Sequence, residues 1–327
     1  MKNFLTYRLS FNAWTCFAYV IIAAILLKSG NTISTLGDYR VYRVAVYSFN
    51  PLEFSPEVFT QFIFSYINIL WDQVVTGLIL LFSIVIWIEK ERKIKIQDIF
   101  IFIAIFNPFV LQFFFFESKE FLMCVAIFFY IRIRIPSKKN QALLLTLVAL
   151  IRPMAVILLI PLLIERVAKG RRILFGYFIP WLFAFTFLSI YFSIDFNQYY
   201  ESYIRHLSNA FLGYSGASTN RYEINVPVRL FSQETLVILY TGLYTVFFPI
   251  ISSSIFSSFL IMVTGFFKAY LFIKVYLRER YKWIIVASLF GYAVPLSIYN
   301  IGSSLRYSIP FFFMLYILYY LRRKSDN

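Results

Sequence analysis

A single arginine interrupts one of the most apolar stretches of this chain. Arg152 lies within LLLTLVALIRPMAVILLIPLLI, and the other residues of that segment carry no ionised side chain. A charge at the centre of a lipid-facing helix costs about 3 kcal/mol on insertion scales. Pro153 follows directly, and a broken helix is tolerated at membrane depth only against protein or a wet cavity. We therefore predict that Arg152 faces a cavity for an anionic ligand. Snorkelling to an interface, or pairing with a membrane carboxylate, is the alternative.

The composition of the whole chain is typical of a membrane protein. Of its 327 residues, 60% are hydrophobic, 21% are aromatic and only 14% are charged. Apolar runs recur from residue 11 to residue 321, and no polar stretch between them is long enough for a separate soluble domain. We therefore predict a single all-α integral membrane domain over residues 1–327.

The basic residues gather in short segments between the apolar runs. Together these segments contain 21 Lys or Arg against 6 Asp or Glu, and they are residues 1–10, 89–98, 132–140, 165–172, 274–282 and 322–327. The positive-inside rule assigns such segments to the cytoplasm. The net charge of +15 is then a cytoplasmic excess, and it argues against nucleic-acid binding because the basic residues form no stripe on a soluble face.

This alternation predicts a polytopic protein with about 8–10 transmembrane helices and both termini in the cytoplasm. At about 20 residues per crossing, we expect spans near 11–28, 73–88, 99–116, 119–132, 173–193, 257–274, 283–299 and 307–321. Residues 141–151 and 153–164 form either two short helices or a re-entrant hairpin with Arg152 at its tip. Residues 29–72 and 194–256 are then two long outer-side loops that carry interfacial helices.

Three charged residues stand together in the segment FFFFESKEFL. Glu117, Lys119 and Glu120 are expected to form the turn between two helices on the outer side. Two carboxylates beside a lysine at the edge of the hydrocarbon could supply a proton acceptor and a phosphate ligand. The alternative is that these residues only provide the polarity that a hairpin turn needs.

A second charged group follows the first predicted span, in the segment GDYRVYR. Asp38 lies beside Arg40 and Arg43, so a base could stand next to cations that neutralise a phosphate. An aromatic-rich interfacial helix with an internal salt bridge would have the same sequence.

The outer turn before the last predicted span has the sequence NIGSSLRYSIPFF. Arg306 is the only charged residue between Lys282 and Arg322. It could snorkel to the interface. If it lies opposite Arg152, the two guanidinium groups form a clamp for an anion, and we predict that they approach one another across an outward-facing cavity.

The long loop 194–256 adds Arg221 and Arg229 as further candidate ligands for an anion. His206 is the only histidine, so a histidine-based metal cluster is excluded on ligand supply. We expect no metal site and no cofactor, although Mg²⁺ held by carboxylates and phosphate stays open. The sequence has neither a Walker-type phosphate loop nor a dinucleotide-binding G-x-G-x-x-G segment.

Taken in order, these segments resemble bacterial membrane proteins of surface-polysaccharide assembly. GDYRVY after the first span, ESKE at the start of a helix, LIRP about thirty residues later and NIGSSLRY before the last helix carry the resemblance. The chain resembles the Wzy-type O-antigen or capsule polymerases and, more broadly, membrane glycosyltransferases with the C-type fold. In C-type enzymes an acidic residue in the first outer loop is taken to be the catalytic base, and Asp38 matches that position, although the doubled acidic signature of some members is absent here.

The resemblance implies a polymerase of lipid-linked oligosaccharide at the outer face of the bacterial inner membrane. Its donor would be a polyprenyl diphosphate-linked oligosaccharide, whose diphosphate leaves when an acceptor hydroxyl attacks the sugar. A C-type transferase that uses another acceptor, or a flippase for lipid-linked glycan, is the alternative. A chain-length regulator and a flippase of the same pathway would be its partners, together with membrane lipid.

The resemblance also bears on individual residues. It favours Asp38 as the base that orients the acceptor, with Glu120 as the rival and Glu117 beside it. Arg152, Arg306 and Lys119 would bind the diphosphate, with Arg40, Arg43, Arg221 and Arg229 as further candidates. Wzy-type proteins are known for functional arginines in outer loops, and Arg221 and Arg229 lie in the corresponding loop.

Overall fold

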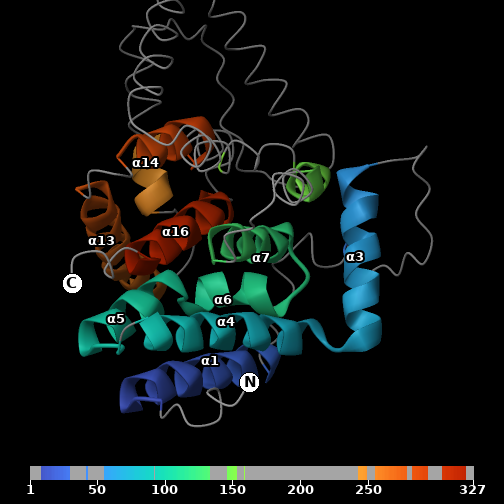
Figure 1. The fold of residues 1–327 in the computed structure, drawn as a ribbon, viewed down its shortest axis with the longest axis horizontal. Coiled ribbons are helices and arrows are strands. Elements are labelled where there is room, and N and C mark those ends of the chain that lie inside the picture. The colour runs from blue at the N-terminus through green and yellow to red at the C-terminus, as the bar shows by residue number, and fades with distance from the viewer. Residues whose placement is uncertain are drawn as a thin grey trace, which may run out of the picture.

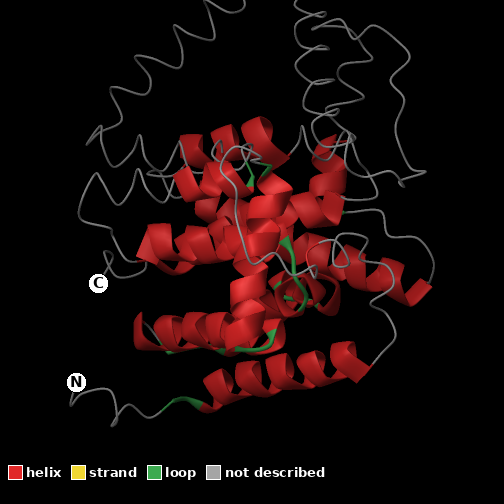
Figure 2. Cartoon of the chain, turned by 90° about the vertical axis from the view of Figure 1, so that its right-hand side faces the viewer, coloured by secondary structure: helices red, strands yellow, loops and turns green. Residues whose placement is uncertain are grey.

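The computed structural model describes the following residues of the chain: 9–29, 42, 55–91, 93–132, 146–152, 158, 242–248, 255–277, 282–293 and 304–321. Helices dominate this part of the chain, and no residue in it forms a strand (Figure 2). The prediction of an α-helical protein is therefore confirmed for the described residues.

The described helices are drawn in Figure 1 and keep the labels used there. They are α1 (Phe11–Ser29), α3 (Pro56–Leu70), α4 (Gln73–Glu91), α5 (Ile96–Ile105), α6 (Pro108–Phe115), α7 (Lys119–Arg132), α13 (Ile255–Tyr276), α14 (Lys282–Ser288), the π-helix η5 (Leu289–Ala293) and α16 (Ser304–Leu321).

Three of these helices are long and apolar enough to cross a membrane, by length and composition alone. They are α1, α4 and residues 259–276 of α13, and the bent pair α5 and α6 makes a fourth if it counts as one span. The spans expected near 11–28, 73–88 and 257–274 are confirmed as helices. The predicted segment 119–132 matches α7, and 307–321 falls within α16. The chain is thus an α-helical membrane protein.

The span expected over residues 99–116 consists of two helices rather than one continuous helix. The structure divides it into α5 and α6, which meet at an angle of 66°. Asn107 caps α6, because its side chain accepts a hydrogen bond from the Val110 N–H at 3.2 Å, and Pro108 occupies the first helical turn, where no N–H is needed. The Tyr19 hydroxyl donates to the Phe106 carbonyl at 2.8 Å, which satisfies a backbone acceptor at the break.

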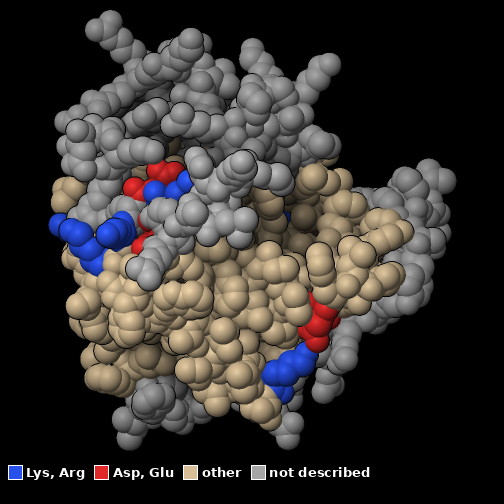
Figure 3. All heavy atoms as spheres, turned by 60° about the horizontal axis from the view of Figure 1, so that its bottom comes forward, with Lys and Arg blue, Asp and Glu red and all other residues tan. Residues whose placement is uncertain are grey.

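Helices α1 and α4 lie antiparallel, and polar contacts at both of their ends define the two ends of the bundle. At one end, the Ser10 N–H donates to Glu89 at 3.0 Å. At the other end, Lys28 pairs with Asp72 at 2.7 Å. Figure 3 shows Lys, Arg, Asp and Glu gathered at two margins of the molecule, with a wide uncharged surface between them. Such an uncharged band is typical of a surface that faces lipid.

Helix α3 runs across the direction of α4 and lies beyond one end of the bundle (Figure 1). Ser55 caps it by accepting a hydrogen bond from the Val58 N–H at 3.1 Å. The last turn leaves Ile69, Leu70 and Trp71 largely exposed. A helix was expected in this outer segment, and this orientation and exposure are typical of a helix that lies along a membrane surface.

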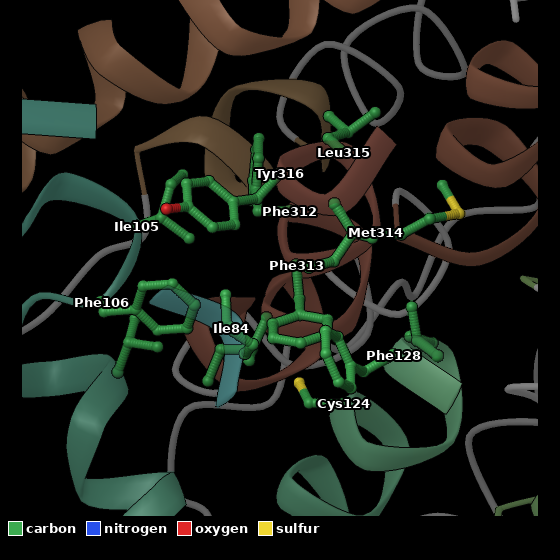
Figure 4. Close-up of a cluster of buried hydrophobic side chains, with 14 of the residues drawn as sticks. Ile84, Ile105, Phe106, Cys124, Phe128, Phe312, Phe313, Met314, Leu315 and Tyr316 are labelled. Atoms are coloured by element: carbon green, nitrogen blue, oxygen red, sulfur yellow. The ribbon is translucent and has the colours of Figure 1, made fainter. Parts of the chain in front are cut away.

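Helix α16 forms the centre of the described bundle. Every side chain from Tyr307 to Tyr320 is buried, and a helix that is apolar all round belongs in an interior. Figure 4 shows Phe313 and Tyr316 of α16 facing Phe106 at the α5–α6 break. The ring centroid of Phe106 lies 5.4 Å from that of Tyr316 and 6.1 Å from that of Phe313. Edge-to-face aromatic packing thus holds the broken helix against α16.

Several predicted features lie wholly or partly outside the described residues. Residues 146–151 are helical and end at Arg152, but the residues that would separate two short helices from a re-entrant hairpin are not described. The predicted span 283–299 is helical as far as residue 293. Residues 173–193 and most of the loops 29–72 and 194–256 also lie outside the described part. The total of 8–10 spans and the cytoplasmic termini remain predictions.

The two ends of the bundle give a test of orientation. Asp72 and Lys93 are both exposed, at opposite ends of α4, whereas the native Cys16 and Cys124 are buried. Because the positive-inside rule assigns the basic residues around Lys93 to the cytoplasmic side, we expect Asp72→Cys to react with a membrane-impermeant maleimide on intact cells. Lys93→Cys should react only after permeabilisation, and the parent protein should not react. Labelling of Lys93→Cys from outside would invert the topology.

Candidate functional site

The ESKE segment forms the turn between α6 and α7, as the sequence predicts. Ser118 joins the two helices, because its hydroxyl donates to the Phe113 carbonyl at 2.6 Å and accepts from the Phe121 N–H at 3.1 Å. The side-chain amide of Asn68 donates to Glu117 at 2.9 Å and so ties this turn to α3. The first turn of α7 is thereby fixed, and it carries Glu120 into the interior.

Glu120 is completely buried, and one of its oxygens binds two arginines. The Nη1 of Arg152 donates to Oε1 at 2.5 Å, and the Nε of Arg306 donates to the same atom at 2.7 Å. The side chain of Arg152 is 4% exposed and that of Arg306 is 18% exposed. The prediction that these two arginines lie close together is confirmed. The outward-facing cavity between them stays a prediction.

This arrangement also realises the alternative considered for Arg152, because the arginine pairs with a membrane carboxylate. One carboxylate nevertheless serves two guanidinium groups, so the three side chains carry a formal net charge of +1. Lys119, the residue before Glu120, interacts electrostatically with Arg152, Glu57, Arg306 and Glu120. Glu120 and its two arginines are cationic as a trio, which is the property expected of an anion site.

Aromatic rings stand against two of these cations. The guanidinium of Arg152 lies 4.7 Å from the ring centroid of Tyr307, and the ammonium of Lys119 lies 5.4 Å from that of Tyr42. Such cation–π contacts stabilise a cation that has left water. Tyr42 belongs to the segment GDYRVYR, so one residue of that segment contacts the ESKE turn. Sequence reasoning did not select Tyr307, although it directly follows Arg306.

Glu120 and Tyr292 each have a buried polar atom at this site for which the described part of the chain provides no hydrogen-bond partner. These atoms are Oε2 of Glu120 and the hydroxyl of Tyr292, and both side chains have no exposed surface. Tyr292 interacts electrostatically with Glu120, Arg152 and Tyr307. It belongs to η5, which packs against α16. A π-helical turn often marks a functional site, but the sequence carries no signal for this one, and Tyr292 was not predicted.

The remaining candidate residues lie outside the described part of the chain. They are Asp38, Arg40, Arg43, Arg221 and Arg229. Their roles stay predictions. Within the described residues, no group of three or more His, Cys, Asp or Glu side chains is placed to hold a metal ion.

Lys268, which the sequence analysis assigned to no site, is a buried lysine. It lies in α13 with its ammonium 4.9 Å from the ring centroid of Phe312. No described carboxylate forms an ion pair with it, so it differs from the arginines around Glu120.

Comparisons with known proteins found no similar protein. No family model matches this sequence, and neither a curated protein nor a solved structure matches it. The resemblance to polysaccharide polymerases therefore remains a hypothesis that depends on the four segments named above.

The contacts of Glu120 predict a large effect on stability. Removing the carboxylate with Glu120→Ala leaves two guanidinium groups in the interior without their shared acceptor. We expect a loss of about 3–5 kcal/mol in the free energy of unfolding, which is typical for breaking a buried ion pair. Denaturant unfolding of the detergent-solubilised protein, followed by tryptophan fluorescence, measures it.

The matched control is the exposed ion pair at the same end of the bundle. Lys28 and Asp72 are 55% and 53% exposed, so Lys28→Ala should cost no more than about 1 kcal/mol. Equal losses for Lys28→Ala and Glu120→Ala would contradict the assignment of Glu120 as a structural tie.

Proposed function

We propose that this protein is a membrane glycosyltransferase that polymerises lipid-linked oligosaccharide repeat units at the outer face of the bacterial inner membrane. In the reaction, the growing glycan leaves a polyprenyl diphosphate and joins an acceptor hydroxyl. The observation that carries the proposal is the convergence of Arg152, Arg306 and Lys119 around Glu120. Each of the four segments that suggested the resemblance contributes a residue to this group of side chains or contacts it. The segment GDYRVY contributes through Tyr42, which contacts Lys119.

The chemistry requires cations at the leaving group. When the bond between the sugar and the diphosphate breaks, negative charge develops on the diphosphate oxygens. Each guanidinium carries five N–H groups in a planar fork, so an arginine that binds Glu120 can bind a phosphate oxygen as well. Fixed cations in a site of low dielectric stabilise such charge more strongly than water does. The energy for transfer is already stored in the donor, so no nucleotide site is required.

The surroundings of the cluster suit a substrate with a long lipid. Helix α3 presents exposed apolar side chains close to the turn that carries Glu117, through the bond between Asn68 and Glu117. The exposed apolar surface of α1 and α4 continues towards the other end of the bundle. A polyprenyl chain could lie along this surface while its diphosphate reaches the cations. This is why we favour a lipid-linked donor over a soluble anion.

The charge distribution supports an outer location for the chemistry. The cluster lies at the end of the bundle that holds Lys28 and Asp72, because Gln73 at the start of α4 donates to the Phe114 carbonyl at 3.1 Å. The excess of basic residues lies in the segments assigned to the cytoplasm, and Lys93 belongs to one of them at the opposite end of α4. An outer site meets lipid-linked glycan after it has crossed the membrane.

The proposal is tested with lipid-linked repeat units extracted from a strain in which the gene for this chain is deleted. The purified protein, in lipid nanodiscs, should convert them into longer glycans and release polyprenyl diphosphate. The deletion strain should show surface glycan shortened to single repeats. Normal glycan length in the deletion strain, with no elongation by the purified protein, would refute the proposed function.

The arginine geometry predicts which substitutions abolish transfer. Arg152→Lys and Arg306→Lys keep the charge but replace a planar fork by a point charge. We expect each to reduce glycan transfer by roughly 10²-fold, the scale seen when one preorganised donor is removed from a charge-stabilising site. The measurement is elongation of the extracted repeat units, at equal amounts of folded protein.

Lys28→Arg provides the control, because Lys28 belongs to the exposed pair at the same end of the bundle. It should transfer glycan at the parent rate. Parent rates in both Arg152→Lys and Arg306→Lys would show that the guanidinium fork plays no part.

A further inference from the structure

The two oxygens of Glu120 have different surroundings, and this difference points to a second binding position. Oε1 accepts hydrogen bonds from both arginines. Oε2 is buried and has no donor in the described part of the structure. Leaving a buried carboxylate oxygen without a donor costs free energy, so a native structure that keeps one calls for a partner not included in the chain.

The hydroxyl of Tyr292 lacks a hydrogen-bond acceptor, just as Oε2 of Glu120 lacks a donor, in the described part of the structure. It is a buried O–H group with no acceptor among the described residues, and it belongs to a side chain that interacts electrostatically with Glu120. Oε2 of an ionised carboxylate can only accept a hydrogen bond, whereas a tyrosine hydroxyl can donate one. A single ligand hydroxyl placed between them would donate to Oε2 and accept from Tyr292, which would satisfy both atoms.

We propose that Glu120 Oε2 and the Tyr292 hydroxyl form the subsite for the acceptor hydroxyl of the glycan. This inference rests on the proposed function, and it assigns to Glu120 the role that the sequence analysis favoured for Asp38. Glu120 thereby links the two halves of the reaction. One of its oxygens positions the arginines that face the leaving diphosphate, and the other orients the attacking hydroxyl.

The reaction step balances with the acceptor, the donor, these side chains and water. The acceptor oxygen forms a bond to the sugar C1, and the bond between C1 and the diphosphate oxygen breaks. The electron pair of that bond leaves with the polyprenyl diphosphate, whose charge the arginines neutralise. The hydroxyl proton passes to Oε2 and from there to water as the product leaves. Arg306 and Lys119 are the partly exposed members of the cluster, so the acceptor approaches from their side.

Two substitutions separate this subsite from the clamp. Glu120→Gln keeps an oxygen for the two arginines but places an NH₂ group, which cannot accept a hydrogen bond, where Oε2 stood. Tyr292→Phe removes only the hydroxyl. Both variants should bind undecaprenyl diphosphate at least as tightly as the parent, because the cations remain and Glu120→Gln removes a negative charge.

Transfer should respond differently from binding. We expect glycan transfer to fall by roughly 10²-fold or more in Glu120→Gln, the scale of lost general-base catalysis. It should fall by about tenfold in Tyr292→Phe, which loses one hydrogen bond. Because both groups hold the same hydroxyl, the double variant should be little worse than Glu120→Gln alone.

The matched control is Tyr320→Phe, which removes a buried tyrosine hydroxyl that bonds to Asp98 at the opposite end of the bundle. It should transfer glycan at the parent rate. Parent rates in Glu120→Gln and Tyr292→Phe would show that the two atoms bind only water, and would overturn the subsite while leaving the proposed function intact. A parent protein that neither binds undecaprenyl diphosphate nor elongates glycan would overturn both.

Discussion

The ion pairs around Glu120 connect parts of the chain that are far apart in sequence. Arg152 follows the helical residues 146–151, Glu120 lies in the first turn of α7, and Arg306 lies in the first turn of α16. Ionised side chains are costly in a membrane protein unless they meet one another or a wet cavity. The positions of these three segments are therefore coupled, because displacing any one of them would leave a buried charge without its partner.

The ion pairs of Glu120 with Arg152 and Arg306 lie at one end of the bundle. The bend between α5 and α6 lets α6 end at the ESKE turn, and Ser118 then fixes the start of α7. The buried helix α16 begins at the same end of the bundle, where Arg306 meets Glu120, and its aromatic side chains pack against Phe106 at the bend. The packing of the interior and the placement of the charges are in this way two results of the same helix arrangement.

Part of this could be predicted from the sequence, and the reason is local. Arg152 and Arg306 are conspicuous because each is an isolated charge beside apolar residues, and α1 and α4 follow from the length of their apolar runs. The bend at Asn107 also has a local signal, an Asn-Pro pair, which the assignment of a single span over 99–116 overlooked.

The rest depends on contacts that no local pattern contains. Glu120 and Arg306 are 186 positions apart, and nothing near either residue indicates that both arginines share one oxygen of Glu120. Tyr292 lies in the π-helix η5, and the packing of η5 against α16 places it at the site. Neither the π-helix nor this packing can be recognised before the bundle is assembled. Sequence reasoning thus identified Glu120 and the arginines as separate candidates, but not the contacts that join them.

Stability alone does not account for this cluster. A buried ion pair is often no more stabilising than apolar side chains of similar volume, because desolvation offsets the attraction between the charges. Lys268 shows that this bundle can bury a lysine with an aromatic ring as its neighbour and with no ion pair to a described carboxylate. The Glu120 cluster differs in its excess of cations and in the unpartnered oxygen that it retains. Unbalanced charge and a buried oxygen without a partner both reduce the stability that an ion pair can provide. Both are features that a binding site for an anion and a hydroxyl would have.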